Sequence, residues 1–207
     1  DHARVEVVED LRAAFHRLRK GRAGLDVVGD IELFAWAVRA RSASKVIGVT
    51  GTDGKTTTCN LLYRILQGAG IKTGMVSTVN AVIGDEILDT GFHVTTPDAM
   101  DVQRFLAKMV DAGLTHVILE TTSHGWAQYR VDACEFEIGV ITNITHEHLD
   151  YHGSFENYRS AKARLFTGLV EVQPKKQGGI LLAVLNRDDD SFDYLCDKTK
   201  VPNISYG

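Results

Sequence analysis

The stretch from Val46 to Thr58, Val-Ile-Gly-Val-Thr-Gly-Thr-Asp-Gly-Lys-Thr-Thr-Thr, decides the fold of this chain. It opens with an apolar, β-prone run, turns at Gly51 and Gly54, and continues into a helix-compatible segment that ends near Gln67. A strand–loop–helix unit of this kind directs backbone N–H groups and a helix N-terminus at one point, which suits an anion. The stretch therefore predicts a phosphate-binding loop and a chain that binds a nucleoside triphosphate.

The side chains after the second glycine strengthen this prediction. Lys55 can reach the terminal phosphates as a point charge, and the Thr56 hydroxyl can ligate Mg²⁺. The usual motif has an earlier glycine at the position where this chain has Val49. The alternative is a glycine-rich turn that only joins a strand to a helix, and the Lys-Thr pair with its flanks favours nucleotide binding. The predicted nucleotide-binding residues are Gly51, Thr52, Asp53, Gly54, Lys55, Thr56 and Thr57.

Length and composition limit the class of protein. The chain has 207 residues, of which 44% are hydrophobic and 24% charged, as in an ordinary globular protein with one sizeable core. The net charge of −4 and the lack of a basic run argue against nucleic-acid binding. No apolar run has membrane-spanning length, and the first residue is not Met, so we expect a piece of a longer cytoplasmic protein without membrane contact. The scattered cysteines fit a reducing compartment better than disulfides or a zinc site (Cys59, Cys134 and Cys196).

Beyond the phosphate loop, short apolar runs alternate with helix-compatible segments. This alternation predicts an α/β fold with a mostly parallel sheet flanked by helices. Asn80–Thr90 breaks the rhythm and predicts a small β-hairpin insertion. Two further helices are expected before the first strand, at Val5–Lys20 and Asp30–Arg39. Strands are predicted at 46–50, 73–78, 116–121, 138–144, 180–186 and 203–206, and helices at 55–70, 98–112, 155–169 and 192–198.

A second group of polar residues follows two of the predicted strands. Glu120 ends the third strand, and a loop rich in histidine and acidic residues follows the fourth, from Ile144 to Gly153. Ligands bind at strand ends of this kind in open parallel sheets. The HExxH zinc pattern fails because Asp150 stands where the second histidine is required. Oxygen ligands there would suit Mg²⁺, with histidine as a further ligand, whereas the alternative is a solvated polar loop with capping histidines.

Several motifs, in order along the chain, resemble those of the Mur ligases. The resemblance runs from about Val46 to Gly207 and is greatest to the UDP-N-acetylmuramoyl-tripeptide synthetase branch, whereas Gly29–Phe34 looks more like the D-glutamate-adding branch. The motifs that carry it are Gly51-Thr52-x-Gly54-Lys55-Thr56-Thr57, Thr95-Thr96-Pro97, Glu120-x-x-Ser123-His124, Gln128-x-Arg130, Thr142-Asn143-Ile144-Thr145-x-x-His148-Leu149-Asp150-x-His152-Gly153 and Ala161-Lys162-x-x-Leu165-Phe166.

The resemblance implies a domain organisation. The family has an N-terminal domain that binds the UDP-sugar, a central ATPase domain and a C-terminal domain that recognises the incoming amino acid. We therefore expect residues 1–44 to be a remnant of the N-terminal region and its linker. Residues 45–207 are expected to form the central ATP-binding ligase domain, and the C-terminal ligase domain is expected to be absent from this chain. The missing domains would then be partners, together with a UDP-N-acetylmuramoyl-peptide and an amino acid.

The resemblance also implies a reaction, the ATP-dependent formation of an amide in peptidoglycan precursor synthesis. The γ-phosphoryl group passes to a substrate carboxylate, and an amine then displaces phosphate from the acyl phosphate. Such phosphoryl transfer depends on positioning and on neutralising charge. By resemblance, the catalytic residues are Lys55, His148 and Lys162. Thr56 and Glu120 hold one Mg²⁺, and Glu120, His148 and a carbamylated Lys162 hold a second.

Carbamylation requires a neutral amine, so the resemblance implies that the site lowers the pKa of Lys162. The helical pattern alone predicts a solvent-facing lysine instead. The match to the family also assigns a muramoyl-peptide site, in which Arg130 pairs with a carboxylate. The alternatives there are turn or cap residues, with Thr96 as the N-cap of a helix whose first residue is Pro97, and Trp126 as a packing residue. The substrate residues implied are Thr95, Thr96, Ser123, Gln128 and Arg130.

Two other functions stay open from the sequence. One is a related ligase of the folylpolyglutamate, cyanophycin or poly-γ-glutamate type. The other is a stand-alone nucleotide-binding module without ligase activity.

Overall fold

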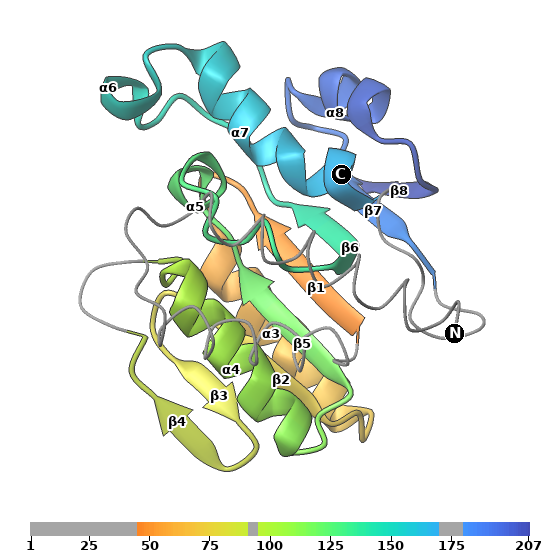
Figure 1. Cartoon of the computed structure of the whole chain (residues 1–207). Coiled ribbons are helices and arrows are strands. Elements are labelled where there is room, and N and C mark those ends of the chain that lie inside the picture. Colours follow the sequence, from red (N-terminus) through yellow and green to blue (C-terminus); the bar gives the residue numbers. More distant parts are fainter. Residues whose placement is uncertain (1–44, 91–94, 170–179) are drawn as a thin grey trace, which may run out of the picture.

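The structure, a computed structural model, describes residues 45–90, 95–169 and 180–207. The helices expected at Val5–Lys20 and Asp30–Arg39, and the whole of the remnant expected at 1–44, lie outside these ranges. The described residues form an eight-stranded sheet flanked by helices (Figure 1). Its strands are β1 (Lys45–Thr50), β2 (Thr73–Val76), β3 (Ala81–Ile83), β4 (Glu86–Leu88), β5 (His116–Glu120), β6 (Phe136–Ile141), β7 (Leu182–Asn186) and β8 (Asn203–Tyr206).

The helices follow the predicted pattern closely, with two additions. The short helices α5 and α6 were not predicted, because four or five residues are too few to show a helical period. The helix predicted at 98–112 spans Ala99–Asp111, so Pro97 is not its first residue. Asp98 is its N-cap and accepts a hydrogen bond of 2.9 Å from the amide of Asp101, so the cap role considered for Thr96 is wrong. The described helices are α3 (Lys55–Gly68), α4 (Ala99–Asp111), α5 (Ser123–Ala127), α6 (Leu149–His152), α7 (Phe155–Gly168) and α8 (Phe192–Lys198).

The strand order β4-β3-β2-β5-β1-β6-β7-β8 places β1 between β5 and β6. β1 runs parallel to both neighbours, and the parallel pairing continues to β2 on one side and to β7 and β8 on the other. Among the described strands, only β3 runs antiparallel to its neighbours, β2 and β4, and β3 and β4 form the predicted hairpin. Because β3 pairs with β2, this hairpin extends the main sheet at its edge. The predicted α/β fold with a mostly parallel sheet is confirmed.

The two faces of the central strand β1 pack against different helices. Ile47 and Val49 face one core, which includes Cys59 of α3. Val46 faces the other core, which includes apolar residues of α4 and α7. Figure 1 shows α3 and α4 on opposite sides of the sheet. Strands covered on both faces read as nearly continuous apolar runs, which is why the sequence predicted them well.

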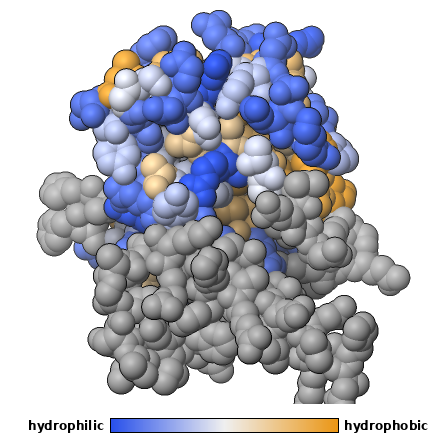
Figure 2. Space-filling model, turned by 45° about the horizontal axis from the view of Figure 1, so that its top comes forward, coloured by the Kyte–Doolittle hydropathy of each residue, from blue (hydrophilic) through white to orange (hydrophobic). Residues whose placement is uncertain are grey.

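The pairing of β1 with its neighbours sets the position of the functional residues. Val49 pairs with Glu120 of β5, and Thr50 pairs with Ile141 of β6. The segment after β1 therefore emerges between the residues that follow β5 and those that follow β6. This is the edge of the sheet where ligands bind in open parallel folds. Figure 2 views the molecule with this end turned forward, and its surface is mostly hydrophilic with apolar atoms showing between the polar ones.

None of the described helices is long and apolar enough to cross a membrane. The three cysteines are free thiols, and Cys59 lies on the buried face of α3.

Candidate active site

The phosphate loop has a backbone that requires glycine at two positions. Gly51 has φ of 149°, and a Cβ atom on it would lie 1.8 Å from Oγ1 of Thr142. Gly54 has φ of 76° and is the N-cap of α3. Both angles lie in a region that favours glycine. α3 begins at Lys55 without a side-chain cap, so the N–H groups of its first turn are left for a ligand.

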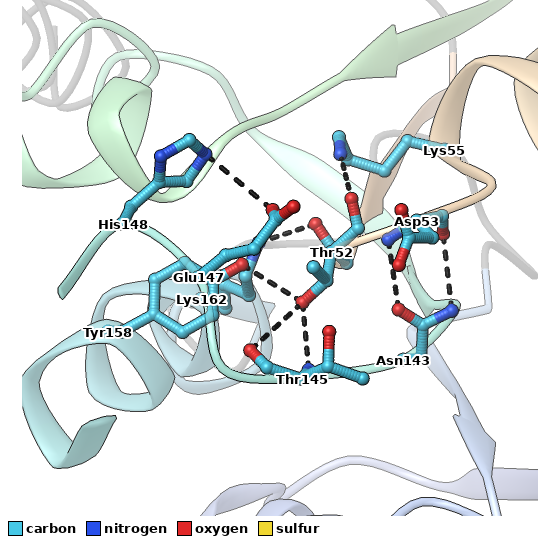
Figure 3. Close-up of polar contacts among 10 residues, drawn as sticks. Thr52, Asp53, Lys55, Asn143, Thr145, Glu147, His148, Tyr158 and Lys162 are labelled. Carbon is cyan, nitrogen blue, oxygen red and sulfur yellow. Dashed lines mark hydrogen bonds and ion pairs between the residues drawn. The ribbon is translucent and has the colours of Figure 1, made fainter.

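Asn143 and Thr142, which follow β6, hold the rest of the loop (Figure 3). The Thr52 amide donates to the carbonyl of Asn143 at 2.8 Å, and the Asp53 amide donates to its Oδ1 at 2.9 Å. The Thr142 hydroxyl donates to the Asp53 carbonyl at 2.6 Å. The amides of Thr52 and Asp53 are thus already bonded within the protein. The amides of the first turn of α3 have no side-chain cap and remain for phosphate oxygens.

The ammonium group of Lys55 lies against the phosphate loop. Its Nζ atom donates to the carbonyl of Thr52 at 2.7 Å, so the side chain folds back over the loop (Figure 3). A phosphate that enters the loop would compete with a single neutral carbonyl for this ammonium group. This placement agrees with the role predicted for Lys55.

Glu120 is buried at the end of β5 and is surrounded by donors. Its side chain is 1% exposed. The Thr56 hydroxyl donates to its two oxygens at 2.9 and 3.0 Å, and Thr78 donates to it from both its amide, at 3.0 Å, and its hydroxyl, at 2.9 Å. A hydroxyl and a carboxylate side by side are hard oxygen donors of the kind that Mg²⁺ prefers. The structure therefore brings together the two residues predicted to share one Mg²⁺, and it adds Thr78, which sequence reasoning missed.

Lys162 of α7 is buried directly behind the phosphate loop. It is 2% exposed, and its Nζ atom donates to the carbonyl of Gly51 at 2.5 Å. Burial, and secondarily the charge of Lys55, lowers the pKa of Lys162 to about 7, although Glu147 and Asp53 act in the opposite direction. The solvent-facing position that the helical pattern predicted for this lysine is wrong, because α7 turns this face towards the loop.

Tyr158, one helical turn before Lys162, completes this wall of the site. Its hydroxyl lies 2.9 Å from the Thr52 hydroxyl, which also accepts from the amide of Thr145 at 2.9 Å. The Lys162 ammonium lies 4.6 Å from the centre of the Tyr158 ring. Burial raises the pKa of Tyr158 to about 12, so the phenol stays neutral. The spacing of four residues between Tyr158 and Lys162 places them on one helical face and was the signal available in the sequence.

His148, the N-cap of α6, lies beside Glu147. It is half-exposed, has a left-handed backbone with φ of 54°, and its Nε2 atom lies 3.7 Å from a carboxylate oxygen of Glu147. Within the described ranges, no group of three or more His, Cys, Asp or Glu residues is arranged to hold a metal ion. The structure brings Thr56 and Glu120 into contact, and the second set, to which His148 was assigned, stays a prediction.

A cluster of rings surrounds His124, a residue without a predicted role. Its ring centre lies 4.8 Å from that of His148, 4.2 Å from that of Tyr151 and 5.4 Å from that of His152. Burial and then the neighbouring histidines lower the pKa of His124 and of His152, so both imidazoles favour the neutral form. Two of the quoted motifs contained the three histidines but left Tyr151 unspecified, and only the approach of α6 to α5 brings the four rings together.

The predicted substrate residues lie along α5 and the segment before α4. Arg130 donates to the carbonyl of Thr96 at 2.7 Å and to Oε1 of Gln128, and Gln128 donates to the Tyr151 hydroxyl at 3.1 Å. Ser123 is 1% exposed, and its Oγ atom has no hydrogen-bond partner among the described residues. Thr95 is half-buried beside Thr96, which accepts from the amide of Thr122 at 3.0 Å. Trp126 is buried, as predicted for a packing residue.

A parallel sheet with a phosphate loop after its central strand, and with a buried hydroxyl–carboxylate pair beside the loop, defines an α/β domain of the phosphate-loop class. The chain belongs to the Mur ligase family, because the family's middle domain, described as "Mur ligase middle domain", matches residues 49–207. The resemblance found in the motifs is therefore confirmed.

Curated relatives carry names from one branch of this family. The chain is 41% identical over 165 residues to the UDP-N-acetylmuramoyl-L-alanyl-D-glutamate–2,6-diaminopimelate ligase of Cytophaga hutchinsonii, covering 80% of this chain and 32% of the relative. It is 40% identical over 162 residues to UDP-N-acetylmuramyl-tripeptide synthetase 2 of Oceanobacillus iheyensis, covering 78% and 32%. The chain thus spans about a third of the length of these relatives.

Solved structures agree with this assignment. The structure of a UDP-N-acetylmuramoyl-L-alanyl-D-glutamate–2,6-diaminopimelate ligase is similar, with a TM-score of 0.70 and 28% identity, covering 84% of this chain and 35% of that one. E. coli FolC in complex with DHPP and ADP has a TM-score of 0.61 at 20% identity, covering 95% and 51%. The second likeness shows the fold alone.

Proposed function

We propose that this chain is the ATP-dependent middle domain of an amide ligase that adds an amino acid to a UDP-N-acetylmuramoyl-peptide. The observation that carries the proposal is the buried amine of Lys162 on the carbonyl of Gly51. A phosphate loop that only binds a nucleotide does not require such a group behind it. The names of the curated relatives support the same substrate class.

The residues of this chain fit the first half of such a reaction. The first-turn amides of α3 bind phosphate oxygens, and Lys55 neutralises their charge. The substrate carboxylate attacks the γ-phosphorus atom, the bond to the β-phosphate oxygen breaks, and ADP leaves. The amine then attacks the carbonyl carbon of the acyl phosphate, the bond from that carbon to the phosphate oxygen breaks, and the amide forms as inorganic phosphate and a proton leave. For this chemistry the protein supplies position and charge rather than a nucleophile of its own.

Thr56 and Glu120 are the residues that would hold Mg²⁺. They fit it because both supply hard oxygen donors and because the carboxylate is already fixed by Thr56 and Thr78. Bound there, the ion would supply positive charge to the phosphate oxygens during transfer.

We infer in addition that Lys162 is carbamylated in the active protein. A carbamate forms when a neutral amine reacts with CO₂, and burial that lowers the pKa of Lys162 to about 7 leaves much of the amine neutral near that pH. The product is an anionic oxygen donor, which with Glu120 and His148 would suit a second Mg²⁺.

The muramoyl-peptide is proposed to bind beside α5. The residues for this role are Thr95, Thr96, Ser123, Gln128 and Arg130. A buried hydroxyl without a partner, as at Ser123, costs free energy unless another group satisfies it. A polar substrate atom is such a group. Arg130 already lies beside Gln128 and Thr96, so a substrate carboxylate would find its guanidinium held in place.

Trapping the acyl phosphate tests the proposal. The chain is mixed with ATP, MgCl₂, UDP-N-acetylmuramoyl-L-alanyl-D-glutamate and hydroxylamine, and hydroxamate and ADP are measured. We expect weak ATP binding and a substrate-dependent hydroxamate, without complete ligation, because the chain spans only about a third of its relatives. Hydroxamate from a folate-type carboxylate in place of the muramoyl-peptide would favour a folylpolyglutamate-type ligase. Nucleotide binding that neither carboxylate affects would favour a stand-alone module.

A further inference from the structure

Arg164 of α7 makes a dense set of contacts with the segment after α5. Its Nη2 atom lies 2.7 Å from each oxygen of Asp132, and its Nη1 atom donates to the carbonyl of Trp126. The side chain of Arg164 is 32% exposed and that of Asp132 is 13% exposed. Both Asp132 oxygens contact the single Nη2 atom while Nη1 binds the Trp126 carbonyl, and these two anchors together fix the orientation of the guanidinium. Arg164 was not predicted as a site residue.

The contacts of Arg164 converge on a turn with an unfavourable backbone. Tyr129 has φ of 58°, in the left-handed region. For a residue other than glycine this conformation is unfavourable, and it persists only where the surroundings hold it. The Tyr129 amide donates to the same Trp126 carbonyl that Arg164 binds, at 3.2 Å. The Arg164 guanidinium also lies 4.8 Å from the centre of the Tyr129 ring, within the range of a cation–π contact.

The orientation of two predicted substrate residues depends on this turn. Gln128 and Arg130 flank Tyr129 in the sequence. The Gln128 side chain donates to the Tyr151 hydroxyl, and the Arg130 side chain donates to the Thr96 carbonyl. If Tyr129 relaxed to a right-handed conformation, the backbone direction on either side of it would change. Gln128 and Arg130 would then leave their present positions and lose their contacts with Tyr151 and Thr96.

We propose that Arg164 is a positioning residue that holds the 126–130 turn in its left-handed conformation and thereby aims Gln128 and Arg130 at the substrate. It acts through the turn and does not touch the substrate. Lys162 lies two residues earlier on the same helix, so α7 fixes the phosphate loop and the substrate turn together. The part that concerns the substrate rests on the proposed function.

The test compares Arg164→Met with Arg159→Met in the 207-residue chain. Met keeps most of the volume of the side chain and removes the charge and the donors. Arg159 lies on the same helix but contacts Tyr194, at 4.1 Å from its ring centre, on the side of α8. Amide hydrogen exchange is measured over residues 126–130. Affinities are measured by calorimetry for MgATP and for UDP-N-acetylmuramoyl-L-alanyl-D-glutamate, well below the unfolding temperature.

We expect Arg164→Met to speed exchange of the 128–130 amides by about tenfold or more, with no such change in Arg159→Met. Affinity for the muramoyl-peptide should fall by about tenfold, while that for MgATP stays within about twofold of the wild-type value. Arg164→Lys keeps the charge but cannot bridge the carboxylate and the carbonyl together, so it should recover only part of the affinity.

Unchanged exchange at 128–130 in Arg164→Met would overturn the proposal. An equal loss of affinity for both ligands would also overturn it, since that result describes a general structural role. If Arg164→Met does not fold, Asp132→Asn replaces it, because this change weakens the same bidentate contact and leaves the Trp126 contact in place. If the wild-type chain does not bind the muramoyl-peptide, the proposed function fails, and the exchange data alone decide whether Arg164 holds the turn.

Discussion

The side-chain amine of Lys162 lies 2.5 Å from the carbonyl oxygen of Gly51, although 111 residues separate them in the sequence. This contact joins α7 to the first glycine of the phosphate loop. The same glycine has no room for a side chain, because Thr142 occupies the space on its other side. The shape of the loop therefore depends on two elements that follow it in the sequence, the segment after β6 and the buried face of α7.

Lys55→Ala should abolish nucleotide binding or turnover. The substitution removes the charge nearest the terminal phosphates, and we expect a loss of at least on the order of 100-fold if this charge stabilises the transition state. Affinity for MgATP is measured by calorimetry, and turnover by ADP release. Lys108→Ala, at an exposed position on α4, is the matched control and should behave like the wild type. Near-normal affinity and turnover in Lys55→Ala would contradict the role of this residue.

Gly51→Ala should destabilise the protein by at least about 2 kcal/mol, because the new Cβ atom collides with the Thr142 hydroxyl and the backbone angle disfavours any side chain. The double variant Gly51→Ala/Thr142→Ala should recover part of the lost stability, because it removes the collision with the hydroxyl but not the unfavourable backbone angle. Gly68→Ala at the end of α3 meets no atom within 4 Å and is the control. Urea unfolding measures all of these variants, and equal stability of Gly51→Ala and Gly68→Ala would show that the loop tolerates a side chain.

The sequence predicted best those features whose residues are close together in the chain. The phosphate loop was found because its strand, glycines and helix are adjacent in the chain, and the buried parallel strands were found because their apolar runs are continuous. The grouping of Thr56 with Glu120 was predicted from the resemblance to a family, and pairing of β1 with β5 explains it physically.

Other features depend on tertiary contacts that no local pattern contains. Lys162 has an ordinary helical setting in the sequence, and only the packing of α7 shows that its amine is buried. Thr78 contacts Glu120, and Arg164 contacts the segment after α5, but neither residue is a specified position of a quoted motif. The short helices α5 and α6 are too brief for a periodic signal, so the ring cluster around His124 also could not be predicted.

Substitution of Lys162 by Met should change how stability depends on pH. The pKa of Lys162 is lowered to about 7 in the folded chain from its ordinary value of 10.5, so between these pH values the unfolded state binds more protons. Wild-type stability therefore rises relative to Lys162→Met as the pH rises through this window. The slope is at most about 1.4 kcal/mol per pH unit for one proton.

This comparison is made by urea unfolding in buffers free of bicarbonate, which keep the amine unmodified. Groups shared by both proteins cancel in the difference between their free energies of unfolding. A difference that is flat from about pH 7 to 10, or that falls as the pH rises, would show that the amine is not held in a setting that disfavours its charge.

Glu120→Gln should weaken the binding of MgATP by about tenfold or more, because it removes the only charge of the Thr56–Glu120 pair while keeping its shape. Affinity for ATP in EDTA should change much less. Glu86→Gln, at an exposed position in β4, is the control. Equal losses with and without Mg²⁺ would show that Glu120 acts through the fold of the loop and not through the metal ion.

The last prediction concerns the modification of Lys162. With ¹³C-bicarbonate, MgCl₂ and a nucleotide present, the wild-type protein should show a carbamate carbon resonance that is absent from Lys162→Ala. Acid abolishes such adducts, so the spectrum is recorded near neutral pH, where burial leaves much of the amine unprotonated. Lys162→Ala should lose the formation of acyl phosphate and regain part of it with formate or acetate, since a small carboxylate can supply the missing oxygens. Propionamide, of similar size but without charge, should not restore activity. If the labelled sample shows no carbamate signal and carboxylates restore no activity, Lys162 is not carbamylated. The buried amine then acts only through its contact with Gly51.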